Sequence, residues 1–399
     1  MDNSSFLSKA KSKFADGVVR SKTVLSAKFG SGVFDAAVFS PSRISRGNVL
    51  QIVNRLLDGD SEATGELESL KGENARKALD VIQEFLDHNI DISATETDWG
   101  IPLSPGVRLV QSMVKLSQLS GQYPSHFFVK VNPPLSSKSN LTVVRGGFQT
   151  EVFVSQYQKK KVAVKQLRMI AWRLLEPQRQ IVQNEFYLAC LEWRQFRHPN
   201  ILPIYGLLAE ARQPTLILPW RERGNIRCYL QQPDVQVDVK QRMKWISDIA
   251  NGLFYMHRCR ECHGNLRGDK ILISDENVAQ ITDIGMSRFR KYWSEDIIPG
   301  VEHSDRWTAP EVLGGANPST FSDMFSFGLV CIEIFTEAIP FPEYFSMGAA
   351  DKILLGEYPC QPEKMPDDLW KCVEQCLHPH PYHRPSIYTV LKGKFFHID

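Results

Sequence analysis

The sequence predicts an α+β protein, in which a small strand-rich part is followed by a large helical part and preceded by a separate helical module. Three observations support this. Apolar residues recur at helical spacing between residues 46 and 121. Short β-branched runs bounded by Gly, Pro, Asn and Lys begin at about residue 126. From residue 238 onward most of the chain has a helical pattern.

Composition restricts the class of protein. The 399 residues carry 47 Lys and Arg against 45 Asp and Glu, and 43% of them are hydrophobic. This balance is that of a soluble globular chain of two to three domains, and it excludes disorder throughout. A net charge of +2 argues against nucleic-acid binding. The apolar run at 325–332 is too short to span a bilayer, so no integral membrane segment is expected.

The N-terminus is predicted to be a basic, disordered tail over residues 1–45. It has no signal-peptide core, and eight cysteines are too few for a disulfide scaffold, so a cytoplasmic location is expected. Residues 1–30 carry six basic and two acidic side chains, with Phe6, Ala10, Phe14 and Val18 at helical spacing. A mitochondrial presequence and a peripheral membrane helix therefore stay open beside the favoured interpretation, a frayed or partner-binding tail.

Residues 46–125 are predicted to form a helical module. Two amphipathic stripes come first, and a third helix is marked by Ser104 as N-cap, Pro105 in its first turn and Gly121 after its last turn. Such a module fits a partner-docking or autoregulatory role, or a simple extension that covers the strand-rich part. The next strands, at 126–131, 141–144, 152–154 and 162–164, suggest an antiparallel meander.

The chemistry lies in a series of short motifs whose order and spacing are specific. They occupy residues 146–152, 162–165, 198–201, 263–270, 283–285, 309–311, 322–328 and 384–386. Together they resemble the eukaryotic protein kinase superfamily, closest to its tyrosine-kinase-like group, over residues 137–396. The resemblance implies a bilobal fold with a β-rich N-lobe at about 137–218 and a helical C-lobe at about 222–396. The whole chain resembles the expanded tyrosine-kinase-like families of mushroom-forming fungi.

The resemblance implies ATP as the nucleotide. Lys165 falls on the lysine that holds the phosphates, Asp283 on the Mg²⁺-binding aspartate, and Gly146 and Gly147 on the glycine loop. The carbonyl of Pro219 and the N–H of Arg221 fall where the family reads adenine, and proline keeps its carbonyl. The apolar lining of the adenine site falls on Leu218 at the gatekeeper position and on Val152, Ala163 and Leu272 around the ring.

Several positions depart from the family pattern. The catalytic aspartate falls on Asn265, which cannot accept a proton, and the second Mg²⁺ ligand falls on Lys270. The glutamate that pairs with the phosphate-binding lysine falls on Ala189, with Glu185 and Glu192 nearby on the same helix. The glycine loop lacks its third glycine. Among the catalytic-loop positions, Asn265 and Arg267 are counted with Lys165 as candidates for catalysis.

These departures predict a catalytically impaired signalling pseudokinase or scaffold that still binds ATP, with Mg²⁺ binding weakened and a second Mg²⁺ argued against by Lys270. The alternative is an active or slow Ser/Thr/Tyr kinase in which Glu185 restores the ion pair with Lys165. Under both interpretations the chain acts on another protein, as a binding partner or as a substrate. Lys270 has three possible orientations: toward Asp269, toward solvent, or onto phosphate in place of a metal.

Other residues predict a retained frame. The resemblance assigns Glu311 and Arg384 to a buried salt bridge and Asp323 to the anchoring of the catalytic-loop backbone. His263, Ile284 and Trp193 fall on the packed column between the lobes. The Cys-x-x-Cys-His pattern at 259–263 and the pair Cys372 and Cys376 suggest haem or zinc, but coincidence is the better interpretation.

Overall fold

The computed structural model describes residues 44–89, 104–132, 143–146, 150–167, 176–209, 211, 213–288 and 304–393. It divides into two compact units, Met1–Phe127 and Phe128–Asp399. The expected tail at 1–45 lies outside the described residues apart from its last two positions. Within the described ranges, no helix is both long enough and apolar enough to cross a membrane.

The first unit is helical, as predicted. Ser104 accepts a hydrogen bond from the N–H of Val107 at 3.2 Å, and Gly121 ends the last helix with φ +66°. The predicted caps are therefore confirmed. Apolar stripes bury a core in which Leu79, Ile82 and Met113 are fully enclosed. The helices are α2 (Arg46–Asp58), α3 (Ser61–Glu68), α4 (Gly72–Asn89) and α5 (Pro105–Ser120), followed by the 3₁₀ turn η1 (Ser125–Phe127).

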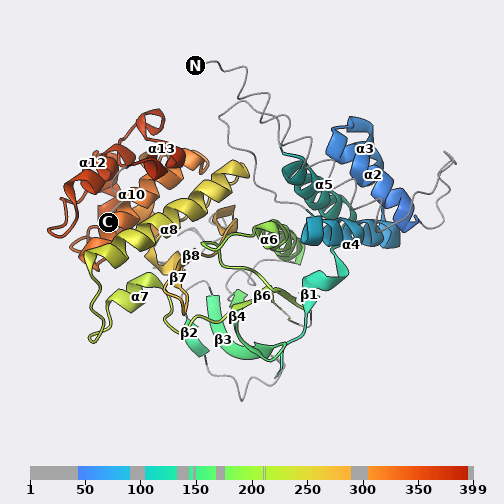
Figure 1. Cartoon of the computed structure of the whole chain (residues 1–399), viewed down its shortest axis with the longest axis horizontal. Coiled ribbons are helices and arrows are strands. Elements are labelled where there is room, and N and C mark those ends of the chain that lie inside the picture. Colours follow the sequence, from blue (N-terminus) through green and yellow to red (C-terminus); the bar gives the residue numbers. More distant parts are fainter. Residues whose placement is uncertain are drawn as a thin grey trace. The chain divides into compact units, whose positions relative to one another are not determined.

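The second unit begins with a six-stranded sheet of order β1-β5-β6-β4-β3-β2 (Figure 1). Its strands are β1 (Phe128–Val129), β2 (Val143–Gly146), β3 (Thr150–Tyr157), β4 (Lys160–Leu167), β5 (Gly206–Leu208) and β6 (Thr215–Pro219), with α6 (Glu176–Gln195) between β4 and β5. The antiparallel meander is right for β2, β3 and β4. It is wrong for β1, which pairs in parallel with β5, because 13 residues separate β1 from β2 and a hairpin needs far fewer.

The rest of the second unit is mainly helical (Figure 1). Its helix α10 (Thr320–Thr336) is buried along almost its whole length. A helix that is apolar all round belongs in the middle of a fold. The elements are α7 (Ile226–Leu230), α8 (Val239–Arg258), η4 (Gly268–Lys270), β7 (Ile271–Ile273), β8 (Ala279–Ile281), η6 (Ser304–Trp307), α9 (Pro310–Leu313), α10 (Thr320–Thr336), α11 (Ser346–Leu354), α12 (Asp367–Cys376), η7 (Pro381–His383) and α13 (Ile387–Leu391).

Successive side chains of β4 point to opposite faces of the sheet, so only every second one is free to line a binding site. Val162 and Val164 point into the sheet core beside Phe153, so Ala163 and Lys165 lie on the opposite face.

The predicted salt bridge of the helical part is present. The Arg384 guanidinium is fully buried and donates to both carboxylate oxygens of Glu311, at 2.7 and 2.8 Å. It also donates to the carbonyl oxygens of Phe321, His378 and Pro379. One side chain therefore joins α9, the start of α10 and the loop after α12.

We expect Arg384→Ala to lower the free energy of unfolding by about 3–5 kcal/mol, because it leaves a partly buried carboxylate and three carbonyls without their donor. Chemical denaturation of the full chain measures this. The matched control Lys371→Ala removes an exposed ion pair with Asp368 and is expected to change stability by less than about 0.5 kcal/mol. Equal effects of the two changes would contradict the structural role of Arg384.

Candidate functional site

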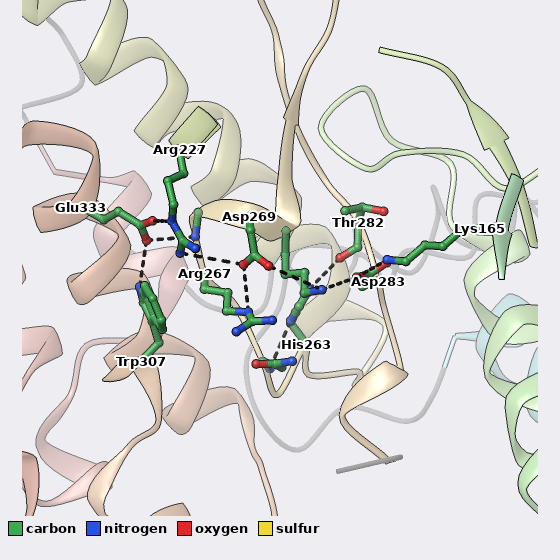
Figure 2. Close-up of polar contacts among 12 residues, drawn as sticks. Lys165, Arg227, His263, Arg267, Asp269, Thr282, Asp283, Trp307 and Glu333 are labelled. Carbon is green, nitrogen blue, oxygen red and sulfur yellow. Dashed lines mark hydrogen bonds and ion pairs between the residues drawn. The ribbon is translucent and has the colours of Figure 1, made fainter. Parts of the chain in front are cut away.

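A single buried carboxylate lies between two lysines. Both oxygens of Asp283 accept hydrogen bonds from Lys165 Nζ at 2.6 Å, and Oδ2 also accepts one from Lys270 Nζ at 2.7 Å. Figure 2 shows Lys165 and Asp283 facing one another. Three residues that are remote in sequence, all predicted as site residues, are thus brought together.

Three elements hold this cluster. Lys165 comes from β4, whose register with β3 places it opposite Val152. Lys270 ends η4, where its carbonyl accepts from the N–H of Thr282 at 2.9 Å. Asp283 follows β8 and adopts φ +65°, a left-handed conformation that aspartate tolerates better than most residues. The β7–β8 hairpin therefore sets the spacing between Lys270 and Asp283.

The charges of the cluster are strongly coupled. Burial opposes ionisation of Asp283, but Lys165 and Lys270 together hold the pKa of this carboxyl far below its ordinary value. Nearby, Arg267 Nε lies 2.8 Å from Asp269 Oδ1, and Lys270 Nζ lies 3.8 Å from Asp269 Oδ2. Three cations, Lys165, Arg267 and Lys270, thus meet two carboxylates, which leaves one positive charge in excess.

The donor set does not fit a resident Mg²⁺ ion. A hard divalent cation needs oxygen ligands with free lone pairs. Here Oδ2 of Asp283 already accepts from two ammonium groups and Oδ1 from one, and Lys270 occupies the position from which a second ligand is expected. An ammonium group about 4 Å from a divalent ion opposes it by about 8 kcal/mol at an effective dielectric of 20.

The loop at 263–267 is anchored as predicted. Asp323 accepts from the backbone N–H groups of His263 and Gly264, at 2.7 and 2.8 Å, and lies 2.9 Å from His257 Nε2. Burial lowers the pKa of His263, and its Nε2–H donates to the carbonyl of Thr282 at 2.9 Å. Its Nδ1 accepts from the N–H of Asn265 at 3.2 Å. One neutral tautomer satisfies both contacts.

Asn265 lines a small pocket together with Trp307, Thr308 and Ala309. The neighbouring Gly264 has φ +68°, and a Cβ there would lie 2.6 Å from Ser287 Oγ. A side chain at position 264 is therefore excluded by both backbone conformation and space.

The predicted adenine-site residues lie on neighbouring elements. Ala163 of β4 is directly opposite Leu218 of β6, and Val154 of β3 is opposite Ala163 on the other side. Leu272 of β7 forms an antiparallel bridge with Asn225, which follows β6 and Arg221 in the chain. The predicted residues Val152, Ala163 and Leu272 are half-buried, Pro219 ends β6, and the Arg221 side chain donates to Gln280 Oε1 at 2.8 Å. Gly146 ends β2, and Gly147 lies outside the described residues.

Helix α6 approaches the turn after Asp283 very closely. Ala189 is buried, and a Cβ added to Gly285 would lie 3.3 Å from the Cβ of Ala189. The carboxylate that contacts Lys165 is Asp283 rather than a glutamate of α6. Glu192 instead pairs with Arg288, with Nη2 to Oε2 at 2.6 Å, and Arg288 also lies 3.6 Å from Glu261. Arg288 thus links α6 to the loop after α8.

Comparison with known proteins assigns the family. A family model described as protein tyrosine and serine/threonine kinase matches residues 133–393. The chain belongs to the protein kinase family. The sheet and the helical part after it are the N-terminal and C-terminal parts of its kinase domain, and the helical region of α2 to α5 precedes that domain.

Individual relatives are distant. The chain is 25% identical over 253 residues to a probable serine/threonine-protein kinase of Dictyostelium discoideum, covering 63% of this chain and 27% of that protein. It is 28% identical over 207 residues to human tyrosine-protein kinase Fer, covering 50% and 24%. It is 27% identical over 257 residues to mitogen-activated protein kinase kinase kinase dlk-1 of Caenorhabditis briggsae, covering 63% and 28%. The chain thus spans about a quarter of the length of these relatives.

Sequence reasoning missed a buried ionic contact beside the catalytic loop of this kinase domain. Glu333 Oε1 accepts from Arg227 Nε at 2.5 Å, while Oε2 accepts from Trp307 Nε1 at 2.8 Å and from the N–H of Gly268 at 3.0 Å (Figure 2). A Cβ on Gly268 would lie 2.3 Å from Glu333 Oε1, so only glycine fits. The available signal was a lone glutamate inside the apolar helix α10.

The cysteines of the Cys-x-x-Cys-His pattern at 259–263 and the pair Cys372 and Cys376 form no disulfide bond in the structure. All eight cysteines are free thiols. Across the described part of the chain, no group of three or more His, Cys, Asp or Glu side chains is placed so that it could hold a metal ion.

We expect Glu261 to make stability depend on pH. Burial and the neighbouring Glu192 carboxylate raise the pKa of Glu261 to about 7, although Arg288 opposes this. The folded protein keeps the proton up to about pH 7, whereas the unfolded chain releases it near 4.5. Stability is therefore lost as the pH rises through this interval, by about 1–2 kcal/mol once solvent screening is allowed for.

Thermal unfolding of Glu261→Gln checks this. Its melting temperature relative to wild type is expected to increase by about 2–4 °C between pH 5 and pH 8, because glutamine cannot ionise. The exposed change Glu374→Gln is the matched control. A difference that stays constant with pH would show that Glu261 titrates normally.

We expect Ala189→Glu to destabilise the kinase domain rather than to restore a lysine–glutamate pair. The larger, charged side chain starts from a buried position, and burying it without a partner costs about 2–4 kcal/mol. Denaturation, with the exposed Ala316→Glu as control, measures the loss. A stable variant with stronger phosphate transfer would contradict this expectation.

Proposed function

We propose that this protein is a nucleotide-binding, catalytically impaired pseudokinase that acts in signalling by binding a protein partner. One observation carries the proposal: Lys270 Nζ lies 2.7 Å from Asp283 Oδ2, in the place where a kinase needs a metal ligand. The placement in the tyrosine-kinase-like group, and among fungal families within it, stays a prediction.

The excess positive charge supports nucleotide binding with little help from a metal. Members of the kinase family use ATP with Mg²⁺ in general, and the ion offsets the charge of the phosphates. In this chain Lys165, Lys270 and Arg267 supply fixed cations against the carboxylates of Asp269 and Asp283. A triphosphate that displaces Asp283 from Lys165 gains two ammonium groups at once. Val152, Ala163, Leu218 and Leu272 are the residues that would hold adenine.

Slow chemistry follows from two residues. Asn265 has an amide where a kinase has the carboxylate that accepts the substrate proton, and this loss alone is worth about 10²–10⁴ in rate. Asp283 is held by Lys165 and Lys270, so it does not present a free carboxylate near the phosphates. The anchored loop around Asp323 supports a folded domain that keeps its shape for binding.

We expect ATP to bind the wild-type chain with dissociation constants in EDTA and in excess Mg²⁺ that differ by less than about threefold. Lys270→Asn is expected to weaken binding in EDTA by about tenfold and to make binding depend on Mg²⁺, because it removes a cation and restores an oxygen ligand. Titration calorimetry measures both constants. Lys371→Asn, which changes an exposed lysine, is the matched control.

Phosphate transfer separates the proposal from its alternative, a working kinase. We expect transfer to a generic protein substrate to be near background in wild type and to appear in the double variant Asn265→Asp/Lys270→Asn. Brisk wild-type transfer that disappears in Lys165→Ala would overturn the proposal. So would ATP binding that strictly requires Mg²⁺ in the wild-type chain.

A further inference from the structure

Large apolar side chains gather on the surface around α11. Of the ten that are exposed in the described part of the chain, six fall between residues 344 and 358. We call them the α11 apolar surface: Tyr344, Phe345, Met347, Leu354, Leu355 and Tyr358. Phe345 is 93% and Leu355 73% exposed. Isolated exposed apolar residues are ordinary, but a cluster of this kind marks an interaction site.

Phe345, at the start of α11, is unusual both as a helix cap and as an exposed aromatic residue. Phe345 is the N-cap, and it makes no side-chain cap hydrogen bond. Ser, Thr, Asp or Asn at this position stabilises a helix by about 1 kcal/mol. An aromatic ring of this size is also normally buried. A residue that satisfies neither capping nor burial is expected at functional positions.

A buried arginine binds the backbone of the segment that leads into the α11 apolar surface. Buried Arg306 donates to the carbonyl of Phe341 at 2.6 Å and to that of Pro340 at 3.2 Å, and it also contacts the carbonyl of Tyr344. Phe341 itself has φ +56°, a conformation rare for an aromatic residue, which these contacts fix. A pre-formed surface binds with less loss of conformational entropy than a flexible one.

The charges around this surface identify its occupant. Residues 343–358 contain three exposed acids, Glu343, Asp351 and Glu357, and one base, Lys352. Lys352 Nζ pairs with Glu357 at 2.8 Å and lies 5.5 Å from the centre of the Tyr344 ring. The segment therefore carries a net charge of −2. An anionic lipid surface is repelled, and so is a second copy that would present the same acidic rim.

We propose that the α11 apolar surface docks a separate partner protein through a basic amphipathic helix. Large apolar side chains of that helix contact Phe345, Met347 and Leu355, and its lysines or arginines face the acidic rim. The nine residues of α11 extend over about 14 Å, which matches two to three turns of a docked helix. None of these residues belongs to the Lys165–Asp283–Lys270 cluster, so the inference goes beyond the nucleotide site.

Docking here places a partner close to the pocket around Asn265. Arg306, which supports the surface, belongs to η6, and Trp307 at the end of η6 lines that pocket with Thr308. A protein held on α11 is thus next to the segment that leads into the site.

Fluorescence anisotropy on the full chain tests the proposal with two synthetic 18-residue helical peptides. The first has Leu and Phe on one face and Lys on the other, and the second has Glu in place of every Lys. We expect the basic peptide to bind and the acidic peptide to bind at least tenfold more weakly. Phe345→Ser is expected to weaken binding of the basic peptide at least tenfold while keeping or raising the melting temperature, because serine supplies the missing cap.

Two further variants sharpen the test. Ile181→Ser removes an isolated exposed apolar residue of α6 (52% exposed) and is expected to leave binding unchanged. Asp351→Lys is expected to weaken binding of the basic peptide, since it removes the net negative charge. An unchanged affinity in Asp351→Lys would overturn the electrostatic part of the proposal.

Three outcomes of the peptide experiment would overturn the proposal. They are equal binding of both peptides, no binding of the basic peptide up to about 1 mM, and an equal loss of peptide affinity in Phe345→Ser and Ile181→Ser. A concentration-dependent dimer in sedimentation that Phe345→Ser abolishes would show that a second copy covers the surface. Binding to phosphatidylcholine or phosphatidylserine vesicles that Phe345→Ser abolishes would show a lipid contact.

Discussion

The Asp283 carboxylate, held between Lys165 and Lys270, is the contact on which the rest of the site depends. It joins the sheet, the catalytic loop and the turn after β8 by charge, in a region from which most water is excluded. Such a cluster is stable only if its charges nearly balance, since one unpaired buried charge is costly. Asp269 and Arg267 form a second ion pair on the side of Lys270, and the cluster as a whole keeps one positive charge in excess. A kinase that relies on Mg²⁺ leaves this balance to the metal and the phosphates, whereas this chain supplies the cation itself.

Small side chains explain how the cluster is framed. Ala189 of α6 lies so close to the turn after Asp283 that a Cβ on Gly285 would be only 3.3 Å from the Ala189 Cβ. The Ala189 side chain is itself buried. The ionic link between α6 and the catalytic part is made three residues further along, by Glu192 and Arg288. Lys165 thus pairs with Asp283, while Glu192 of α6 pairs with Arg288.

Motif order was enough to predict the two-part kinase fold, the anchoring by Asp323 and the Glu311–Arg384 pair, and residue types at the helix ends predicted the caps of α5. These depend on residue types at fixed spacings, which a sequence displays directly. The contact made by Lys270 was not predicted. The expected orientations were toward Asp269, toward solvent or onto phosphate, whereas the ammonium group donates to Asp283, which the fold brings close. The Arg227–Glu333 contact and the parallel pairing of β1 were missed for a similar reason. Neither leaves a periodic pattern, and each is fixed by packing between distant segments.

The positions that depart from the kinase pattern and the positions that carry the fold are separate. Ala189, Asn265 and Lys270 line the site, whereas Asp323, Arg384 and the apolar helix α10 hold the helical part together. Lys270 changes the charge around Asp283, whereas Asp323 and Arg384 make their hydrogen bonds to other groups. Through Arg306 and Trp307 the second group also supports both α11 and the pocket at Asn265. A domain built in this way can lose phosphate transfer without losing a surface for a partner, since different contacts maintain the two.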